Sequence, residues 1–535
     1  MRYFNTAGPV NCADHYCLPP LERFDLAEVM TLIEQRKYFV LHAPRQTGKT
    51  TCLLALMAHL NRDGAYRAVY VNVEGAQAAR ENVEAGMKAI LSRLGERARI
   101  HLNDLFPGEA WEEILRQRGG YDALNVLLTR WAEADPQPLV LLIDEIDSLV
   151  GDTLIAVLRQ LRAGYDTRPA HFPATVLLCG VRDVRDYRIH SDREKAQITG
   201  GSAFNIKAAS LRLGDFSQTE VGRLYDQHKR ETGQVFEPAA MDTVWELTSG
   251  QPWLANALGY EVCFDMREGR DRSRPITAAM VFAAKENLIL RRETHLDQLA
   301  DKLKEDRVRR VIEPILQGEA FEQDLRSADV QYVIDLGLVQ QDRPGHLQIA
   351  NRIYQEIIPR ELAWEPQMGI TVEPAWYVRA DGRLDLSKLL AEFQQFFREH
   401  VESWIERFAY KEAGPQLLLQ AFLQRIVNHV LSEVEGGGGR IEREYGLGRR
   451  RTDLLVIWPH PAGVQRGVIE LKIRYGALEG TIADGLAQTW EYADRCGADQ
   501  AHLVIFDRTP GKPWTEKIFR QEQVYRDLPI SVWGM

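Results

Sequence analysis

The chain has 535 residues and a formal net charge of −10 at pH 7, and its hydrophobic (45%) and charged (27%) fractions are ordinary for globular proteins. This length suggests roughly three or four domains, and the acidic balance argues against a generally basic coat for nucleic acid. No run of about 18 apolar residues and no secretory leader is visible. The six cysteines show no metal-binding spacing, so we expect reduced thiols in a cytoplasmic protein.

A nucleotide-binding loop is predicted near the N-terminus. The apolar residues 39–41 enter a loop that ends in Gly48-Lys49-Thr50-Thr51, and apolar residues then open a helix. The backbone N–H groups of such a loop point at a bound phosphate. Lys49 would reach the β- and γ-phosphates, and Thr50 would ligate Mg²⁺. An ordinary glycine-containing turn is the alternative. The predicted ATP-binding segment is Ala43 (where a glycine usually stands), Pro44, Arg45, Gln46, Thr47, Gly48, Lys49, Thr50 and Thr51.

A second element of the same site follows the apolar run 139–143, which suits a strand buried on both faces of a parallel sheet. Asp144 would hold Mg²⁺ through water, and Glu145 would orient and polarise the attacking water. Further strands are expected at 38–42, 68–73 and 175–179, which together predict a parallel α/β sheet. After the last of these, Arg182 and Arg185 are candidates for sensing the γ-phosphate, although a solvated loop explains them equally well.

Helical patterns follow from 215 to about 325, and the run Gly250-Gln251-Pro252-Trp253 predicts a helix start in a lid over the nucleotide. A helix, two short strands and a Pro-Gly turn then predict a winged helix, whose weakly basic character favours internal packing over DNA readout. The expected domains are a P-loop ATPase core (1–210), a helical lid (211–285), a winged helix (286–365), a linker (366–384) and a C-terminal α/β domain (385–535).

The C-terminal domain carries a second group of charged residues. Asp453 begins a predicted strand, and in the next strand Glu470 and Lys472 share a face because side chains alternate. Asp453, Glu470 and the Leu471 carbonyl could bind Mg²⁺ or Mn²⁺ for phosphodiester hydrolysis, with Lys472 orienting the water. The alternative is a surface aspartate beside a Glu–Lys ion pair on a small α/β domain.

The surroundings of these residues favour a nucleic-acid substrate. A basic patch of Arg449, Arg450 and Arg451 could hold a phosphate backbone, so DNA is the expected partner. Farther along, Gln488 and Tyr492 lie four residues apart and therefore share one face of a predicted helix.

Two family resemblances follow from these motifs. The first 260 residues resemble AAA-like P-loop ATPases that are related to STAND-type signalling ATPases, through residues 43–51, 143–145, 204–206 and 250–253. The C-terminal domain resembles PD-(D/E)xK nucleases, nearest their RecB-like branch on account of Gln488 and Tyr492. That resemblance implies a catalytic glutamate on the first helix, for which Glu412 is the best match and Glu444 a competitor. The sequence departs from many members in having no proline before Asp453.

The resemblances imply an α/β multidomain protein, in which ATP binding and hydrolysis regulate a Mg²⁺-dependent DNA nuclease of the restriction-endonuclease type. Such fusions suggest bacterial defence or mobile-element control. The alternative is a STAND-like nucleotide-controlled switch or scaffold whose C-terminal domain binds nucleic acid without cutting. A DNA motor is less favoured because no helicase motif set is present. A nucleotide-dependent homo-oligomer is expected, because no arginine finger is evident within the chain.

Overall fold

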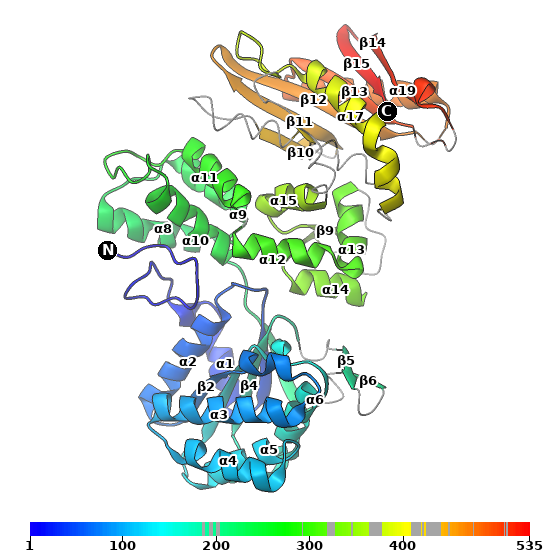
Figure 1. Cartoon of the computed structure of the whole chain (residues 1–535). Coiled ribbons are helices and arrows are strands. Elements are labelled where there is room, and N and C mark those ends of the chain that lie inside the picture. The colour runs from blue at the N-terminus through cyan, green and yellow to red at the C-terminus, as the bar shows by residue number, and fades with distance from the viewer. Residues whose placement is uncertain are drawn as a thin grey trace. The chain divides into compact units, whose positions relative to one another are not determined.

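The computed structural model describes residues 1–183, 188–191, 196–199, 204–291, 293–317, 327–343, 346–362, 377–407, 419, 422–423, 440–447, 450–474, 476–507, 509 and 512–535. The chain divides into two compact units, and Figure 1 labels their helices and strands. We call residues 1–284 and 323–352 the N-terminal unit, and residues 285–322 and 353–535 the C-terminal unit. The range 286–365, predicted as a winged helix, is therefore divided between the two units. The five predicted domain ranges remain predictions.

The N-terminal unit is built on a parallel five-stranded sheet with the strand order β2-β3-β4-β1-β7. The four predicted strands are confirmed to within one residue at each end. The fifth strand was not predicted, because its sequence Lys-Ala-Ala-Ser-Leu-Arg lacks an apolar run and it lies half-exposed at the sheet edge. The strands are β1 (Tyr38–His42), β2 (Arg67–Asn72), β3 (Leu139–Asp144), β4 (Thr175–Gly180) and β7 (Lys207–Arg212).

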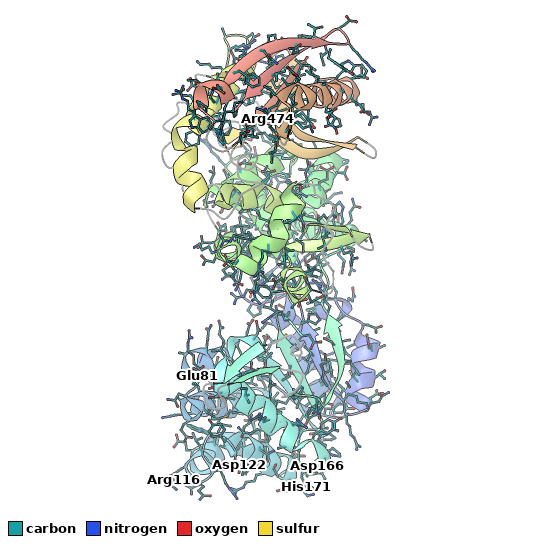
Figure 2. The ribbon with its side chains drawn as sticks, turned by 90° about the vertical axis from the view of Figure 1, so that its right-hand side faces the viewer. Glu81, Arg116, Asp122, Asp166, His171 and Arg474 are labelled. Atoms are coloured by element: carbon teal, nitrogen blue, oxygen red, sulfur yellow. A yellow bond between two sulfur atoms is a disulfide. The ribbon has the colours of Figure 1, made fainter. Side chains whose placement is uncertain are left out.

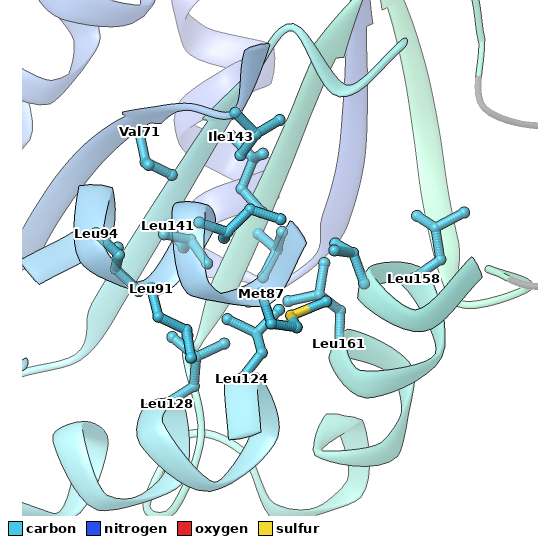
Figure 3. Packing of buried hydrophobic residues seen from close by; sticks show 14 of the residues in the cluster. Val71, Met87, Leu91, Leu94, Leu124, Leu128, Leu141, Ile143, Leu158 and Leu161 are labelled. Carbon is cyan, nitrogen blue, oxygen red and sulfur yellow. The ribbon is translucent and has the colours of Figure 1, made fainter. Parts of the chain in front are cut away.

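Helices cover both faces of this sheet, as the continuous apolar strands require. Leu141 and Ile143 of β3 pack on one face against helices that contribute Met87, Leu91 and Leu124 (Figure 3). The intervening Val140 and Leu142 pack on the opposite face. The helices are α1 (Leu26–Glu34), α2 (Lys49–Asp63), α3 (Val83–Leu102), α4 (Phe106–Arg118), α5 (Ala123–Glu133) and α6 (Gly151–Ala163).

The predicted helices that follow the sheet are present. Ser217 begins α8 with a capping box, since its side chain and that of Glu220 satisfy each other's backbone N–H groups. Gln251 accepts a hydrogen bond from Leu254 N at 2.6 Å and so caps α10. These helices are α8 (Gln218–Thr232), α9 (Pro238–Thr248), α10 (Pro252–Tyr260) and α11 (Ala278–Leu290), and farther on come α14 (Ala328–Asp335), β8 (Val339–Arg343) and β9 (His346–Ile349).

The C-terminal unit contains a six-stranded mixed sheet with the order β10-β11-β12-β13-β15-β14. Its strands are β10 (Arg440–Leu447), β11 (Arg450–His460), β12 (Gly463–Ile473), β13 (Gln500–Phe506), β14 (Phe519–Tyr525) and β15 (Leu528–Gly534). Its helices are α12 (Thr294–Leu303), α13 (Asp306–Gln317), α15 (Arg352–Leu362), α17 (Leu386–Arg407), α19 (Leu478–Cys496) and α20 (Trp514–Lys517).

Alternate residues of this sheet face different helices. Ile469 and Leu471 of β12 pack in one cluster with Phe393 of α17, whereas Val468 packs with Tyr492 of α19. Because side chains alternate along a strand, Glu470 and Lys472 occupy positions on the same face as Val468. The predicted alternation of β12 is therefore confirmed. The helix predicted at 413–434 lies almost entirely outside the described residues.

The cysteines differ in part from the prediction. Cys12 and Cys17 form a disulfide in the N-terminal segment, so the prediction of six reduced thiols is wrong for this pair. A turn closed by the hydrogen bond from His15 N to Asn11 O brings the two Cα atoms to 5.1 Å, which a spacing in sequence does not reveal. The other four cysteines are free thiols. Among the described helices, none has the length and apolar character that crossing a lipid bilayer requires.

Candidate functional site

The predicted phosphate loop connects β1 to α2. Gly48 stands immediately before α2 with φ of 93°, a left-handed conformation that strains any residue with a side chain. Lys49 Nζ donates to Ala43 O at 3.0 Å and to Pro44 O at 2.9 Å, so the lysine folds back over its own loop. The Lys49 side chain is only 5% exposed. The loop thus places a buried cation and the positive end of a helix beside each other, which is the arrangement that phosphates need.

Asp144 at the end of β3 meets the first turn of α2. Its carboxylate is fully buried, and its Oδ2 accepts hydrogen bonds from Thr50 Oγ1 at 2.6 Å and from Tyr70 OH at 3.0 Å. Its Oδ1 accepts a hydrogen bond from Glu145 N at 3.0 Å. A hydroxyl and a carboxylate are hard oxygen donors of the kind that Mg²⁺ prefers. Thr50 and Asp144 therefore fit Mg²⁺, and their role as its ligands stays a prediction. The hydrogen bond from Tyr70 was not predicted.

Glu145 follows β3 in a left-handed backbone conformation with φ of 57°. Burial raises the pKa of its carboxyl, and the nearby charge of Lys49 opposes that effect. A half-buried carboxylate with a raised pKa suits a group that polarises water and takes up a proton. Asp147, in the short 3₁₀ helix Ile146–Ser148 after β3, accepts a hydrogen bond from Val181 N at 3.2 Å and ties together the ends of β3 and β4.

Helix α14, also in the N-terminal unit, lies near the edge of the sheet where β4 and β7 end. The Arg182 guanidinium stands 4.9 Å from the ring centroid of Tyr332 in α14. Arg212, at the end of β7, donates to Ile334 O at 2.9 Å and lies 4.0 Å from the buried carboxylate of Asp335. The role predicted for Arg182 in sensing the γ-phosphate stays a prediction. Arg212 was not singled out from the sequence, because its contact depends on a segment more than a hundred residues away. Arg185 lies outside the described residues.

Gly337, just after α14, approaches the phosphate loop itself. Its φ is 75°, and a Cβ placed there would lie 2.7 Å from Pro44 Cγ. Only glycine accommodates this approach without a shift of the loop. The end of α14 is therefore packed directly against the predicted ATP-binding segment.

A pocket lies beside the phosphate loop. It is lined by the N-terminal segment, the start of α2 and the start of α10, and its lining includes Thr6, Val10, Gln46, Thr51, Trp253 and Asn256. Two hydrogen bonds hold these elements together, from Trp253 Nε1 to Thr6 O at 2.8 Å and from Val10 N to Thr51 Oγ1 at 3.0 Å. The helix start predicted at Gly250–Trp253 thus reaches a pocket next to the loop. The contribution of the N-terminal segment was not predicted from sequence.

The parallel sheet and the loop between β1 and α2 together have the P-loop ATPase fold. The model of the family described as the AAA domain matches residues 33–187. This part of the chain is accordingly an AAA-type P-loop ATPase domain. No curated protein matches the sequence.

Solved structures with similar folds have low sequence identity. The Walker-type ATPase PABY2304 of Pyrococcus abyssi is 14% identical over 66% of this chain and 99% of that chain, with a TM-score of 0.46. Cdc6p from Pyrobaculum aerophilum is 16% identical over 68% and 97%, with a TM-score of 0.36. The Holliday junction branch migration motor RuvB of Thermotoga maritima is 17% identical over 63% and 96%, with a TM-score of 0.33. Similarities this weak identify no function.

The charged residues predicted in the C-terminal unit are partly described. Lys472 Nζ lies 2.7 Å from Glu470 Oε1, and Glu470 is 3% exposed. Gln488 is half-buried in α19, one turn before the buried Tyr492, while Leu471 belongs to the core on the opposite face. Of Asp453, Arg450 and Arg451 only the backbone in β11 is described, and Glu412 and Arg449 lie outside the described residues. Within the described part of the chain, no three His, Cys, Asp or Glu side chains gather as a metal site.

A neighbouring cluster was not predicted. Arg474, which follows β12 (Figure 2), and Lys512 each place a nitrogen 2.7 Å from Asp507 Oδ2 at the end of β13. Burial alone would raise the pKa of Asp507, but hydrogen bonds from Lys512, Thr509 and Arg474 outweigh it and hold the pKa well below its usual value. This ion cluster fixes the segment after β13 close to the strand that carries Glu470 and Lys472.

Proposed function

We propose that the N-terminal unit binds and hydrolyses ATP. The observation that carries this proposal is the 2.6 Å hydrogen bond from Thr50 Oγ1 to the buried Asp144 Oδ2, beside the phosphate loop. Lys49 would leave its loop carbonyls for the β- and γ-phosphates. Thr50 and Asp144 would hold Mg²⁺, which when bound neutralises charge on the phosphate oxygens. Glu145 would orient the attacking water and accept its proton.

The pocket beside the loop is where we place the nucleoside. It adjoins Gly48 and Thr51, so a nucleotide whose phosphates lie on the loop would reach it directly. Apolar and aromatic side chains such as Val10 and Trp253 suit the faces of a base. The N-terminal segment and α10 would thereby both respond to nucleotide binding.

Phosphate release from ATP, measured with and without Mg²⁺, tests this function. Wild-type protein should turn over ATP only with Mg²⁺, and Asp144→Asn should lose at least about tenfold because the carboxylate charge is gone. The matched control is Asp166→Asn, a change on an exposed residue of the same unit (Figure 2), which should leave turnover unchanged. Equal turnover in wild type and Asp144→Asn would refute the proposed site.

For the C-terminal unit we propose Mg²⁺- or Mn²⁺-dependent cleavage of DNA. The support is the pairing of Lys472 with the buried Glu470 on one face of β12. Strands β11 and β12 are antiparallel with Leu454 opposite Ile469, so continuing this register by one residue would bring Asp453 opposite Glu470. Two carboxylate residues and a lysine at one place in a sheet suit metal-assisted phosphodiester hydrolysis. Arg449, Arg450 and Arg451 would contact the DNA backbone.

A cleavage assay on linear, circular and single-stranded DNA with Mg²⁺ or Mn²⁺ tests this proposal. Glu470→Gln should abolish cutting while ATP turnover persists, because it removes a hard anionic ligand. The control is Glu522→Gln, which changes a more exposed carboxylate on β14 of the same sheet. If Glu470→Gln cuts as well as the wild type, the nuclease site is elsewhere or absent.

The second candidate function is a nucleotide-controlled switch or scaffold whose C-terminal unit binds nucleic acid without cutting. The contacts of α14 with Arg182 and Arg212, and the approach of Gly337 to Pro44, favour this function, since they join a distant segment to the edge where ATP would bind. Nucleotide binding would then compete with these contacts and shift a conformational equilibrium. ATP-dependent DNA binding without cleavage in either metal would select this function over the nuclease.

A further inference from the structure

Tyr70 reaches the end of the neighbouring strand. In the parallel pair of β2 and β3, Asn72 is paired with Asp144 and Tyr70 lies two residues earlier, opposite Leu142. The Tyr70 side chain is 4% exposed, and its hydroxyl lies 3.0 Å from Asp144 Oδ2. A tyrosine is long enough to span these two residues along the strand, so its ring packs in the core while its hydroxyl meets the carboxylate.

Tyr70 and Thr50 donate to the same carboxylate oxygen. Thr50 Oγ1 lies 2.6 Å from Asp144 Oδ2, and Glu145 N lies 3.0 Å from the other oxygen. The terminal torsion of an aspartate is broad and is oriented only by its partners. Donors from different parts of the fold, among them α2, β2 and the segment after β3, therefore orient the plane of this carboxylate.

Tyr70 serves this carboxylate as a donor. An ionised carboxylate has only acceptors, so the proton of this hydrogen bond belongs to the Tyr70 hydroxyl. With Oδ2 held by Tyr70, the Thr50 hydroxyl can direct its own proton at Asp144 and keep its lone pairs for a cation.

We propose that Tyr70 is a positioning residue for Mg²⁺ at the ATP site, acting through Asp144. The proposal rests on the ATPase function proposed above and adds a residue outside the predicted motifs. Groups that orient a metal-holding side chain commonly change metal affinity by about 10- to 100-fold when they are removed. Tyr70→Phe should thus weaken Mg²⁺ binding and leave the hydrogen bonds from Lys49 to the loop carbonyls intact.

The experiment compares Tyr70→Phe with Tyr38→Phe. Tyr38 is also fully buried in the same sheet, on β1, but its hydroxyl donates to Pro173 O at 3.0 Å instead of a carboxylate. Both variants lose one buried hydroxyl and keep the ring. For each, the affinity for a fluorescent ATP analogue is titrated with Mg²⁺ and in EDTA, and ATP turnover is measured as a function of Mg²⁺ concentration.

The expected result is a half-saturating Mg²⁺ concentration at least about tenfold higher in Tyr70→Phe, in both binding and turnover. Affinity in EDTA should match the wild type, and turnover at saturating Mg²⁺ should recover. Tyr38→Phe should keep the wild-type Mg²⁺ dependence. If wild-type protein responds to Mg²⁺ and Tyr70→Phe responds identically, the role of Tyr70 is refuted and the ATPase stands. If nucleotide binding and turnover in wild-type protein ignore Mg²⁺, both proposals fall.

Discussion

Replacing Lys49 by alanine tests whether the loop between β1 and α2 binds the phosphates of ATP. The Lys49 ammonium makes hydrogen bonds of 3.0 and 2.9 Å to two loop carbonyls, and it would exchange them for phosphate oxygens when ATP binds. A hydrogen bond that involves a charged group contributes about 1.5–3 kcal/mol. Since about 1.4 kcal/mol corresponds to tenfold in affinity, Lys49→Ala should weaken ATP binding by about 10- to 100-fold and abolish turnover.

The assay is an equilibrium titration with a fluorescent ATP analogue, together with phosphate release. The control is Lys88→Ala, which removes an exposed lysine from α3 of the same unit and should leave both measurements unchanged. Thermal unfolding without nucleotide shows whether the variant is folded. If folded Lys49→Ala binds ATP within about twofold of the wild type, the lysine does not contact the phosphates and the assignment of the loop is wrong.

Three further changes test other parts of the molecule. Glu145→Gln should retain ATP binding but lose turnover, and light scattering should then detect ATP-dependent oligomers. Burial raises the pKa of Glu145, so this carboxylate becomes protonated at a higher pH than an ordinary one. As the pH is lowered, wild-type turnover should therefore begin to decline at a higher pH than an ordinary carboxylate would give. Tyr332→Ala removes the contact between Arg182 and the tyrosine ring, which is worth about 0.5–1 kcal/mol. Because ATP binding would have to break this contact, ATP should bind the variant about two- to fivefold more tightly in the same titration. Burial lowers the pKa of His502 to about 4. Between pH 7 and pH 5 the His502 side chain, with a pKa of about 6.5 in the unfolded chain, therefore binds more protons there than in the folded chain. His502 should contribute about 2 kcal/mol to the fall in stability from pH 7 to pH 5. His502→Gln should flatten this part of the pH dependence of Tm, and an unchanged slope would contradict it.

The sequence alone predicted the central strands and singled out the residues that we propose for the ATPase site. Strands buried on both faces are continuous apolar runs, so 139–143 and 175–179 could be located without a structure. Lys49 and Thr50 follow from the local geometry of a strand, loop and helix. Asp144 and Glu145 follow from their place at the end of a buried strand. Glu470 and Lys472 share a face because of the two-residue period of β12.

The tertiary structure decided what distant segments contribute. The edge strand β7 carries no apolar run, and its pairing with β1 became visible only in the sheet. Tyr70 is one of many aromatic residues in apolar strands until the register places it beside Asp144. The approach of Gly337 to Pro44 likewise joins segments almost three hundred residues apart. Periodicity and local motifs report the conformation of one segment, whereas such contacts depend on the order of strands and on packing across the whole unit.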